Sequence, residues 1–452
     1  MGTGTASGTA SIAEFVAHGV VPPAALDAAA TAVRDTIGVM LAGASEPAAR
    51  LVQSMAMAEG KGDCRVAGIR ERTGATWAAF ANGVAAHALD FDDMCFVSMA
   101  HPSCALLPAA LAACELSHAS GTALLEAYVI GFEIECRLGE VMNPRHYHER
   151  GWHATSTIGT VGAAAAAARV LGLTPAAAGH ALGIAASSAC GLKENLGSMV
   201  KPLHAGMAAR NGLMSALLAQ ADYTASERSL DGPQGFLAAM DSQHPVLDDR
   251  VANLGTHWEI LTSGITVKLY PSCAATHPTL DVLFDLKRRD SFTAGEVASV
   301  EIEVDSMTPR LLLYDRPRTS LEGKFSMPFC AAAALVYDGV GIETFEVERI
   351  ESPRIQALLP VVTMRANTAF DTAAPLSQTR VTVRLRDGRV LAESRNGARG
   401  YPARPASDDE LAAKFASCAR RTLAGPAADR AWSALRRLDG ITDMSALTDL
   451  LT

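Results

Sequence analysis

The side chains best suited to moving protons gather in one short stretch, HALDFDDMCFVSMAHPS, which runs from His87 to Ser103. It contains three aspartates and two histidines, although only 19% of the whole chain is charged. Imidazoles and carboxylates transfer protons near neutral pH when neighbouring groups hold them in position. The stretch therefore predicts acid–base chemistry within an otherwise apolar, alanine-rich neighbourhood.

Three further segments carry histidine with other polar side chains, and two of them also carry lysine. Lysine binds carboxylates and stabilises the negative charge that develops when a proton leaves the neighbouring carbon. The sequence has no phosphate loop, nucleophilic serine elbow or metal motif, so the set predicts proton abstraction next to a carboxylate. The segments are HYHERGWHATST with Tyr147, His148 and His153, GSMVKPLHAG with Lys201 and His204, and VKLYPSCAATH with Lys268, Tyr270, Cys273 and His277.

Each of these residues also has an ordinary structural interpretation. Asp92 and Asp93 could cap helix ends. A histidine beside a proline, as His101 is, more often holds a hydrogen bond than acts as a base, and Lys201 and Lys268 could be solvated. The remaining candidates could pack or lie at the surface: Tyr147 as a packing aromatic, His146 and His148 in an exposed loop, and Cys273 as a small apolar residue.

Their positions favour a functional interpretation of the set. The segments lie where glycine or proline interrupts the regular pattern, which is where backbone can approach a ligand. His101 precedes a helix start, where the helix dipole disfavours the protonated imidazole and suits a neutral base. His153 precedes another helix start, whose N–H groups could hold an anion.

The pattern from about Ser11 to Val251 is helical, and its many alanines favour close helix packing. The segment 28–43 ends on Gly43, a helix-stop residue. Thr155 or Ser156 is the predicted N-cap of the next small-residue helix.

After about Thr262 the pattern alternates with period two in Val297–Ser306 and Thr379–Ser394, and residues 360–367 are expected to form a third strand; Thr379–Ser394 is the later of the two alternating segments. The last of these contains Asp387-Gly388, which predicts a β-hairpin. The sequence thus predicts a mainly α protein with a large all-helical domain and a smaller α+β lid domain. The predicted borders are residues 1–262 for the helical domain, 263–400 for the lid domain and 401–452 for C-terminal helices that rejoin the helical domain.

Composition argues against several classes of protein. A net charge of −9 with a pI near 5.8 and no basic patch argues against a nucleic-acid partner. Nine cysteines without a C-x-x-C pair predict no structural zinc or iron–sulfur cluster, and their odd number without a signal peptide predicts a cytoplasmic protein. The uncharged runs 151–168 and 170–192 are rich in small residues and are expected to be buried helices rather than membrane spans.

Several blocks resemble the signature blocks of the MmgE/PrpD family, in the family's order and spacing from about residue 10 to the C-terminus. They are ANGVAAHALDFDDM, HPS with LLPAALAA, GWHATSTIGTVGAAAAAARVLGL, MVKPLHAGMAARNG and KLYPSCAATHPTLD. The family includes 2-methylcitrate dehydratase, cis-aconitate decarboxylase and iminodisuccinate epimerase. The resemblance implies an enzyme without cofactor or metal that acts on small di- or tricarboxylates. It also implies a homodimer whose active site lies between a helical domain, built from both chain ends, and a lid.

The resemblance assigns roles residue by residue. Positions that match the active site of the decarboxylase are Asp90, His101, His153, Lys201 and Lys268, and the pair that matches the proton-moving residues of the epimerase is Tyr147 and Lys268. Three departures argue against cis-aconitate decarboxylation. Met94 replaces a threonine, Cys273 a histidine and Phe329 an active-site tyrosine.

The leading hypothesis is therefore a cofactor-independent dehydratase of a hydroxy-polycarboxylate such as 2-methylcitrate. In it, His101 is the base and Asp90 orients it, and Tyr147 or His153 protonates the departing hydroxyl. The substrate carboxylates bind to lysines, with a wider binding set of Lys201, Lys268, His204, Tyr270 and Cys273. The alternatives are an epimerase or racemase that uses Tyr147 and Lys268, and a non-catalytic binding protein that keeps the fold.

Overall fold

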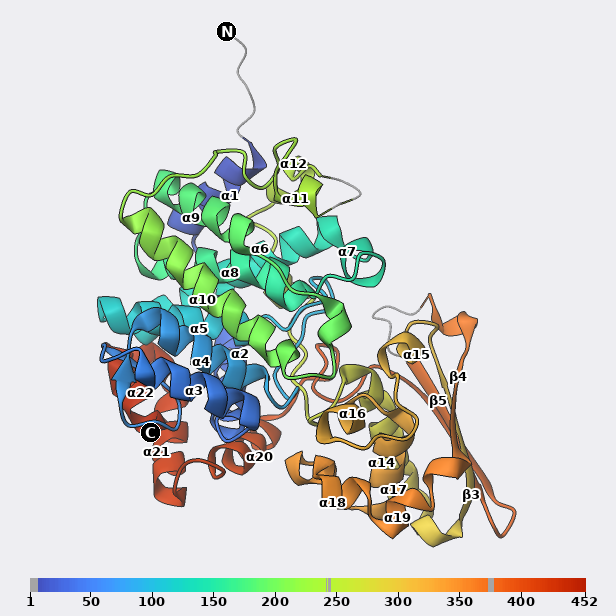
Figure 1. The fold of residues 1–452 in the computed structure, drawn as a ribbon. Helices are drawn as coiled ribbons and strands as arrows, with labels where there is room; N and C mark the ends of the chain where they lie inside the picture. The colour runs from blue at the N-terminus through green and yellow to red at the C-terminus, as the bar shows by residue number, and fades with distance from the viewer. Residues whose placement is uncertain (1–6, 241, 243–244, 373–377) are drawn as a thin grey trace. The chain divides into compact units, whose positions relative to one another are not determined.

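The structure is a computed structural model that describes residues 7–240, 242, 245–372 and 378–452 (Figure 1). The chain divides into two compact units. The helical unit consists of Met1–Ala88, Asp92–Thr266 and Asp408–Thr452, and the sheet unit consists of Leu89–Phe91 and Val267–Ser407. With 58% helix and 9% strand, the predicted mainly α class with a small sheet-containing part is confirmed.

The helical unit contains long helices joined by short connections, with a small two-stranded sheet of β1 and β2. The elements before the sheet unit are α1 Gly8–His18, α2 Pro23–Gly43, α3 Pro47–Ala58, β1 Cys64–Arg65, β2 Arg72–Thr73, α4 Ala75–His87, α5 Ser103–Ser117, α6 Gly121–Met142, α7 Arg145–His148, α8 Ala154–Val170, α9 Pro175–Ser188, η1 Lys193–Asn195, α10 Val200–Gln220, α11 Phe236–Ala239, α12 Asp248–Val251 and α13 Glu259–Thr262. Those after it are α20 Asp408–Ala419, α21 Gly425–Leu435, η7 Leu438–Gly440, α22 Ser445–Thr448 and η8 Asp449–Leu451. The C-terminal helices thus belong to the helical unit, where the buried Lys414 Nζ of α20 lies 2.7 Å from Asp35 Oδ1 of α2.

Small residues let α4, α8 and α10 pack at backbone distance. A Cβ on Gly212 of α10 would lie 2.5 Å from the Cβ of Ala163 in α8. A Cβ on Gly83 of α4 would lie 2.8 Å from the Cα of Gly206 in α10. Helix α8 is buried from Ala154 to Ala168, whereas α9 is buried on one face only. Any larger side chain at these glycines would push the helices apart.

The predicted N-cap of α8 is wrong, because the helix begins two to three residues earlier with His153 as its N-cap. The two hydroxyls named in the prediction make other contacts. Thr155 Oγ1 accepts a hydrogen bond from the His101 amide at 3.0 Å, and Ser156 Oγ donates to the His204 carbonyl at 3.3 Å. In the described part of the chain no single helix is long and apolar enough to cross a membrane, and α1 with α2 reaches that length and composition only as a pair bent by 88°.

The sheet unit is a four-stranded sheet of order β4-β3-β5-β6, with β3 parallel to β4 and antiparallel to β5. Helices α14 and α17 cover one face (Figure 1). The predicted strands and hairpin are confirmed, and Gly388 has the left-handed φ of +93° that the hairpin turn requires. The elements are η2 Ala274–Thr276, α14 His277–Asp290, η3 Ala294–Glu296, β3 Val297–Val304, α15 Thr308–Leu311, α16 Ser320–Lys324, α17 Met327–Val336, η4 Ile342–Phe345, α18 Val347–Ile350, α19 Pro353–Gln356, η5 Leu359–Val361, β4 Val362–Ala366, η6 Thr368–Phe370, β5 Gln378–Leu385 and β6 Val390–Asn396.

A glutamate is buried among the small residues of the helical unit. Glu135 of α6 is fully buried, and neither of its carboxyl oxygens has a hydrogen-bond partner among the described residues. Burial raises its pKa well above the usual range, and the nearby Cys95 and Asp93 raise it further. Burial therefore favours the protonated form of Glu135 in the folded protein.

We expect Glu135→Met to make the protein more stable than the wild type at pH 8, by a margin that shrinks toward pH 5. The folded wild type keeps the proton on Glu135, whereas the unfolded chain releases it above about pH 4.3. The free energy of unfolding of the wild type therefore falls as pH rises from the unfolded-state pKa to the folded-state pKa of Glu135, by roughly 1.4 kcal/mol per pH unit. Methionine fits the same space and does not titrate. Urea unfolding at both pH values measures this.

The control is Glu59→Gln at an exposed position, which should show no pH-dependent difference. A Glu135→Met variant less stable than the wild type at pH 8 would contradict the account.

Candidate active site

Four helix ends in the helical unit bring charged and titratable side chains together. His87 closes α4, His101 precedes α5, His153 caps α8, and α10 begins at Val200. We call the resulting group the histidine cluster, and its members are His87, Asp92, His101, His153, Lys201 and His204. All six are buried except His101, whose side chain is 15% exposed.

A chain of contacts runs through the cluster from Lys201 to His101. Lys201 Nζ lies 2.8 Å from His87 Nε2, and His87 Nδ1 lies 2.7 Å from Asp92 Oδ2. A lysine ammonium only donates hydrogen bonds, so His87 Nε2 accepts and Nδ1 carries the proton that bonds to Asp92. Burial lowers the pKa of His87 to about 3; the carboxylate of Asp92 opposes this and the charge of Lys201 adds to it. His87 is thus a neutral link between a cation and an anion.

Asp92 is the ionised centre of this chain. Burial alone would raise its pKa, but the interactions of its carboxylate with His87 and His101 outweigh burial and hold the pKa well below its usual range. The same Oδ2 atom lies 3.4 Å from His101 Nδ1, an ion-pair distance slightly longer than a hydrogen bond. With Nδ1 facing a carboxylate, Nε2 lies on the opposite edge of the partly exposed ring. A carboxylate that orients an imidazole in this way is the arrangement of a general base.

Asp92, for which helix capping was one of the structural alternatives, is the aspartate of the helical unit that lies beside His101, and the predicted orienting role of Asp90 stays a prediction. Asp92 lies against His101 and caps no helix. Asp90 has a left-handed φ of +52° and belongs to the sheet unit.

Asp93 holds the start of α5, as one of the predicted alternatives suggested. Its carboxyl group accepts hydrogen bonds from the amide and the hydroxyl of Ser103. The Ser103 hydroxyl also forms a hydrogen bond with the Tyr128 hydroxyl. Burial raises the pKa of Asp93 well above its usual range. These contacts fix the turn that carries His101. Tyr128 lies in no sequence motif, so no local signal predicts this contact.

His153 and His204 form a second pair, with their Nδ1 atoms 3.1 Å apart. Burial lowers the pKa of both, and the charge of Lys201 lowers both further. His153 also stacks on His87 with ring centres 5.9 Å apart. Both imidazoles are therefore neutral, and such a group donates a hydrogen bond but holds no additional proton.

Two buried lysines of the sheet unit hold the segment Leu89–Phe91. Lys268 Nζ lies 3.1 Å from Asp90 Oδ1 and donates to the Asp90 carbonyl at 2.9 Å. Lys324 Nζ donates to the carbonyls of Leu89 and Pro271 at 2.7 and 3.0 Å. Asp90 and Lys268 thus form a buried ion pair. Lys324 was not predicted, because nothing in the sequence around it marks a lysine as buried.

The other predicted residues have varied surroundings. The hydroxyl of Tyr270 donates to Asp281 Oδ1 at 2.7 Å and accepts from Arg399 at 2.9 Å, which indicates a structural role in the sheet unit. Cys273 is half-buried just before η2.

Tyr147 lies on α7 with the Lys193 ammonium 4.1 Å above its ring. The prediction of an exposed His146 is wrong, because it is 1% exposed and its Nε2 lies 2.7 Å from a threonine hydroxyl.

The residues of the helical unit that could hold a metal ion are His87, Asp92 and His101, whose ligand atoms lie within 4.8 Å of one another. Both ring nitrogens of His87 are already engaged, one by Asp92 and the other by Lys201. A metal ion bound through His87 would have to displace one of these partners and would lie beside an ammonium group. The donor set as arranged fits a hydrogen-bonded relay better than a metal centre.

We expect the imidazole of His87 to be neutral at about pH 7, with its proton on Nδ1. Histidine ¹⁵N NMR distinguishes protonated from unprotonated ring nitrogens, and His87→Gln assigns the signal. Lys201→Met removes a charge that lowers the pKa of His87, so this pKa should rise. The control Lys201→Arg should keep it low, and an imidazolium or an Nε2 proton at His87 in the wild type would contradict the relay.

Comparisons with known proteins agree with the sequence blocks. The MmgE/PrpD N-terminal domain matches residues 9–247, and the MmgE/PrpD C-terminal domain matches residues 270–439. A cis-aconitate decarboxylase-like protein, oryM, of Aspergillus oryzae is 30% identical over 430 residues, which cover 90% of this chain and 88% of the relative.

Two cis-aconitate decarboxylases are also similar to this chain. The protein of Aspergillus terreus is 29% identical, over 95% of this chain and 92% of its own length. The protein of Mus musculus is 28% identical, over 83% of this chain and 78% of its own length. The two domain matches cover most of the sequence, and the chain therefore belongs to the MmgE/PrpD family.

Proposed function

We propose that this protein is a lyase that removes the α-proton of a small hydroxy di- or tricarboxylate and expels the β-hydroxyl group as water. The observation that carries the proposal is the chain of contacts Lys201–His87–Asp92–His101. It provides a neutral imidazole nitrogen, on His101, that can take the substrate's α-proton. It also provides an ionised carboxylate to stabilise the imidazolium that forms, and a buried cation to attract a polyanion.

In the proposed reaction His101 Nε2 takes the α-proton, and the C–H electrons form the new double bond as the hydroxyl leaves. Asp92 remains ionised and holds the ring throughout, and a positioned base of this kind contributes about 10²–10⁴-fold. The charge of Lys201, with neutral N–H groups from His153 and His204, stabilises the enolate-like charge on the substrate carboxylate.

The leaving hydroxyl needs a proton donor. Because the pKa of His153 is held well below its usual range, His153 suits hydrogen bonding to the substrate better than proton delivery. Of the two donors that the sequence suggests, we therefore propose Tyr147.

Decarboxylation of cis-aconitate is the second candidate, because two relatives that are 28% and 29% identical to this chain are named cis-aconitate decarboxylases. Three positions argue against it. Met94 and Phe329 carry no proton to donate, and Phe329 is fully buried with its ring 5.5 Å from that of Phe345. Cys273, at the third position, is a weaker hydrogen-bond donor than the histidine it replaces. Epimerisation of a dicarboxylate shares the proton-abstraction step and is the third candidate.

Proton NMR in D₂O on 2-methylcitrate, citrate, cis-aconitate, malate, tartrate and iminodisuccinate separates these reactions. We expect a new alkene signal from a hydroxy acid, which would establish dehydration. Loss of a carboxyl group from cis-aconitate would establish the decarboxylase instead, and deuterium entering an α-position without an alkene would establish the epimerase. No change with any compound would contradict the polycarboxylate assignment.

On the compound that reacts, His101→Ala should lower turnover by at least about 10²-fold, as expected for loss of a general base. The matched control is His118→Ala, which removes an exposed histidine of the helical unit and should leave turnover unchanged. Circular dichroism confirms folding of both variants, and near-normal turnover of folded His101→Ala would remove His101 from the mechanism.

A further inference from the structure

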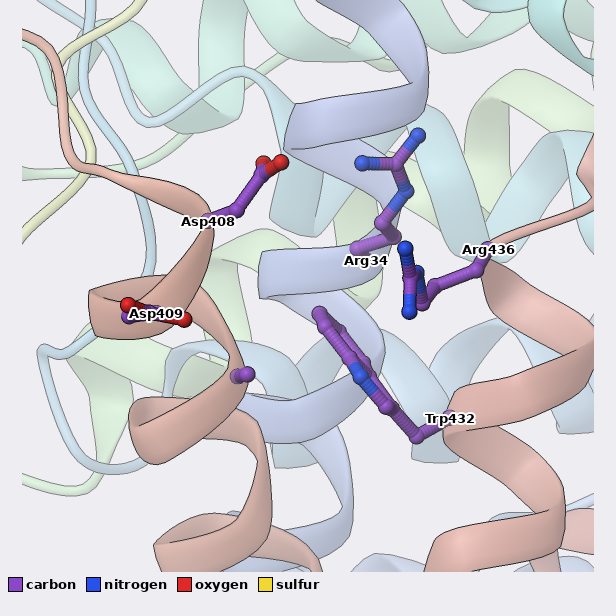
Figure 2. Close-up of a pocket in the computed structure, with 6 residues that line it drawn as sticks. Arg34, Asp408, Asp409, Trp432 and Arg436 are labelled. Carbon is purple, nitrogen blue, oxygen red and sulfur yellow. The ribbon is translucent and has the colours of Figure 1, made fainter.

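The helical unit contains a cavity of about 420 Å³ that the proposed reaction does not use. Its lining comes from α2, the first turns of α20, and α21 with the residue that follows it (Figure 2). Cavities of roughly 300–1,000 Å³ are typical of small-molecule sites. The lining residues are Arg34, Asp408, Asp409, Ala412, Trp432 and Arg436.

The charges in this cavity are separated by sign. Figure 2 shows the two aspartates of α20 on one side and Arg34 and Arg436 on the other, with the Asp408 carboxylate extending toward the arginine side. Within the described part of the chain none of these four side chains has a hydrogen-bond or ion-pair partner, and the Nε atom of Arg34 is buried without one. Two guanidinium groups in one cavity therefore have no ion-pair partner among the described residues.

A flat apolar surface lies beside the guanidinium groups. Trp432 is half-buried, and one side of its ring packs on Phe415 with ring centres 5.0 Å apart. The ring also lines the cavity. An indole in this position offers a stacking surface to a planar ligand, and base–aromatic stacking is worth about 1–3 kcal/mol.

We propose that this cavity binds a phosphate monoester with a hydroxylated, planar body, of which a mononucleotide is the best match. Planar guanidinium groups pair with phosphate oxygens in a fork geometry, so Arg34 and Arg436 hold the phosphate. Carboxylates accept hydrogen bonds from sugar hydroxyls, which assigns the ribose to Asp408 and Asp409. The base stacks on Trp432.

The same charges disfavour a compact polycarboxylate. In such a molecule every end is anionic, so a carboxylate that reaches the arginines leaves another facing the aspartates. A mononucleotide carries its negative charge at one end and neutral hydroxyls at the other. This site is thus distinct in ligand class from the histidine cluster, and the proposal does not rest on the proposed reaction.

Isothermal titration calorimetry of the full chain with AMP, ribose 5-phosphate, inorganic phosphate and citrate tests the proposal. We expect AMP to bind most tightly, ribose 5-phosphate more weakly, and phosphate and citrate weakest. Arg436→Gln, at an exposed position, should weaken AMP binding about tenfold or more, the loss expected for a charged hydrogen bond. The matched control is Arg430→Gln, an exposed arginine on α21, which should bind AMP as the wild type does.

Tryptophan fluorescence provides an independent readout. AMP should quench part of the signal in the wild type, and Trp432→Phe should lose this quenching while it keeps the ring packing on Phe415. Citrate binding as tight as AMP, an Arg436→Gln variant with unchanged affinity, or no AMP binding at millimolar concentration would each overturn the proposal.

Discussion

The charge of Asp92 is the constraint on which the candidate active site depends. A carboxylate with no exposed surface is costly to ionise unless hydrogen bonds and opposite charges surround it. Here the end of α4 supplies His87, the turn before α5 supplies His101, and Lys201 of α10 supplies the cation behind His87. The contacts that stabilise this buried anion thus also fix the orientation of the His101 imidazole, which is partly exposed and proposed to act as the base.

The small residues of the helical core make this convergence possible. Helices α4 and α10 meet at Gly83 and Gly206, neither of which has a side chain. Gly83 lies four residues before His87, and Gly206 lies two residues after His204. Lys201 can then reach the far nitrogen of His87 from a neighbouring helix. The alanine and glycine composition, which predicts close helix packing, therefore also sets the distances within the histidine cluster.

Local patterns in the sequence predicted much of the fold. Period-two alternation predicted most of the strands, and Asp387-Gly388 predicted the hairpin. The helical pattern at both ends of the chain predicted the large helical part. The contact between Asp92 and His101 was beyond local pattern, since it depends on how the segment before α5 folds back on itself. The buried state of His146 and Lys324, and the contact of Tyr128 with Ser103, depend on residues distant in sequence, for which one chain gives no signal.

A double-mutant cycle on Asp92 and His101 tests the central claim most directly. Turnover would be measured for Asp92→Asn, His101→Ala and the combined variant on the compound that reacts. Residues that act as a unit give strongly non-additive losses. If Asp92 acts through His101, the combined variant will lose no more turnover than His101→Ala alone. Losses that multiply would contradict the account, because they would mean that the two residues act independently.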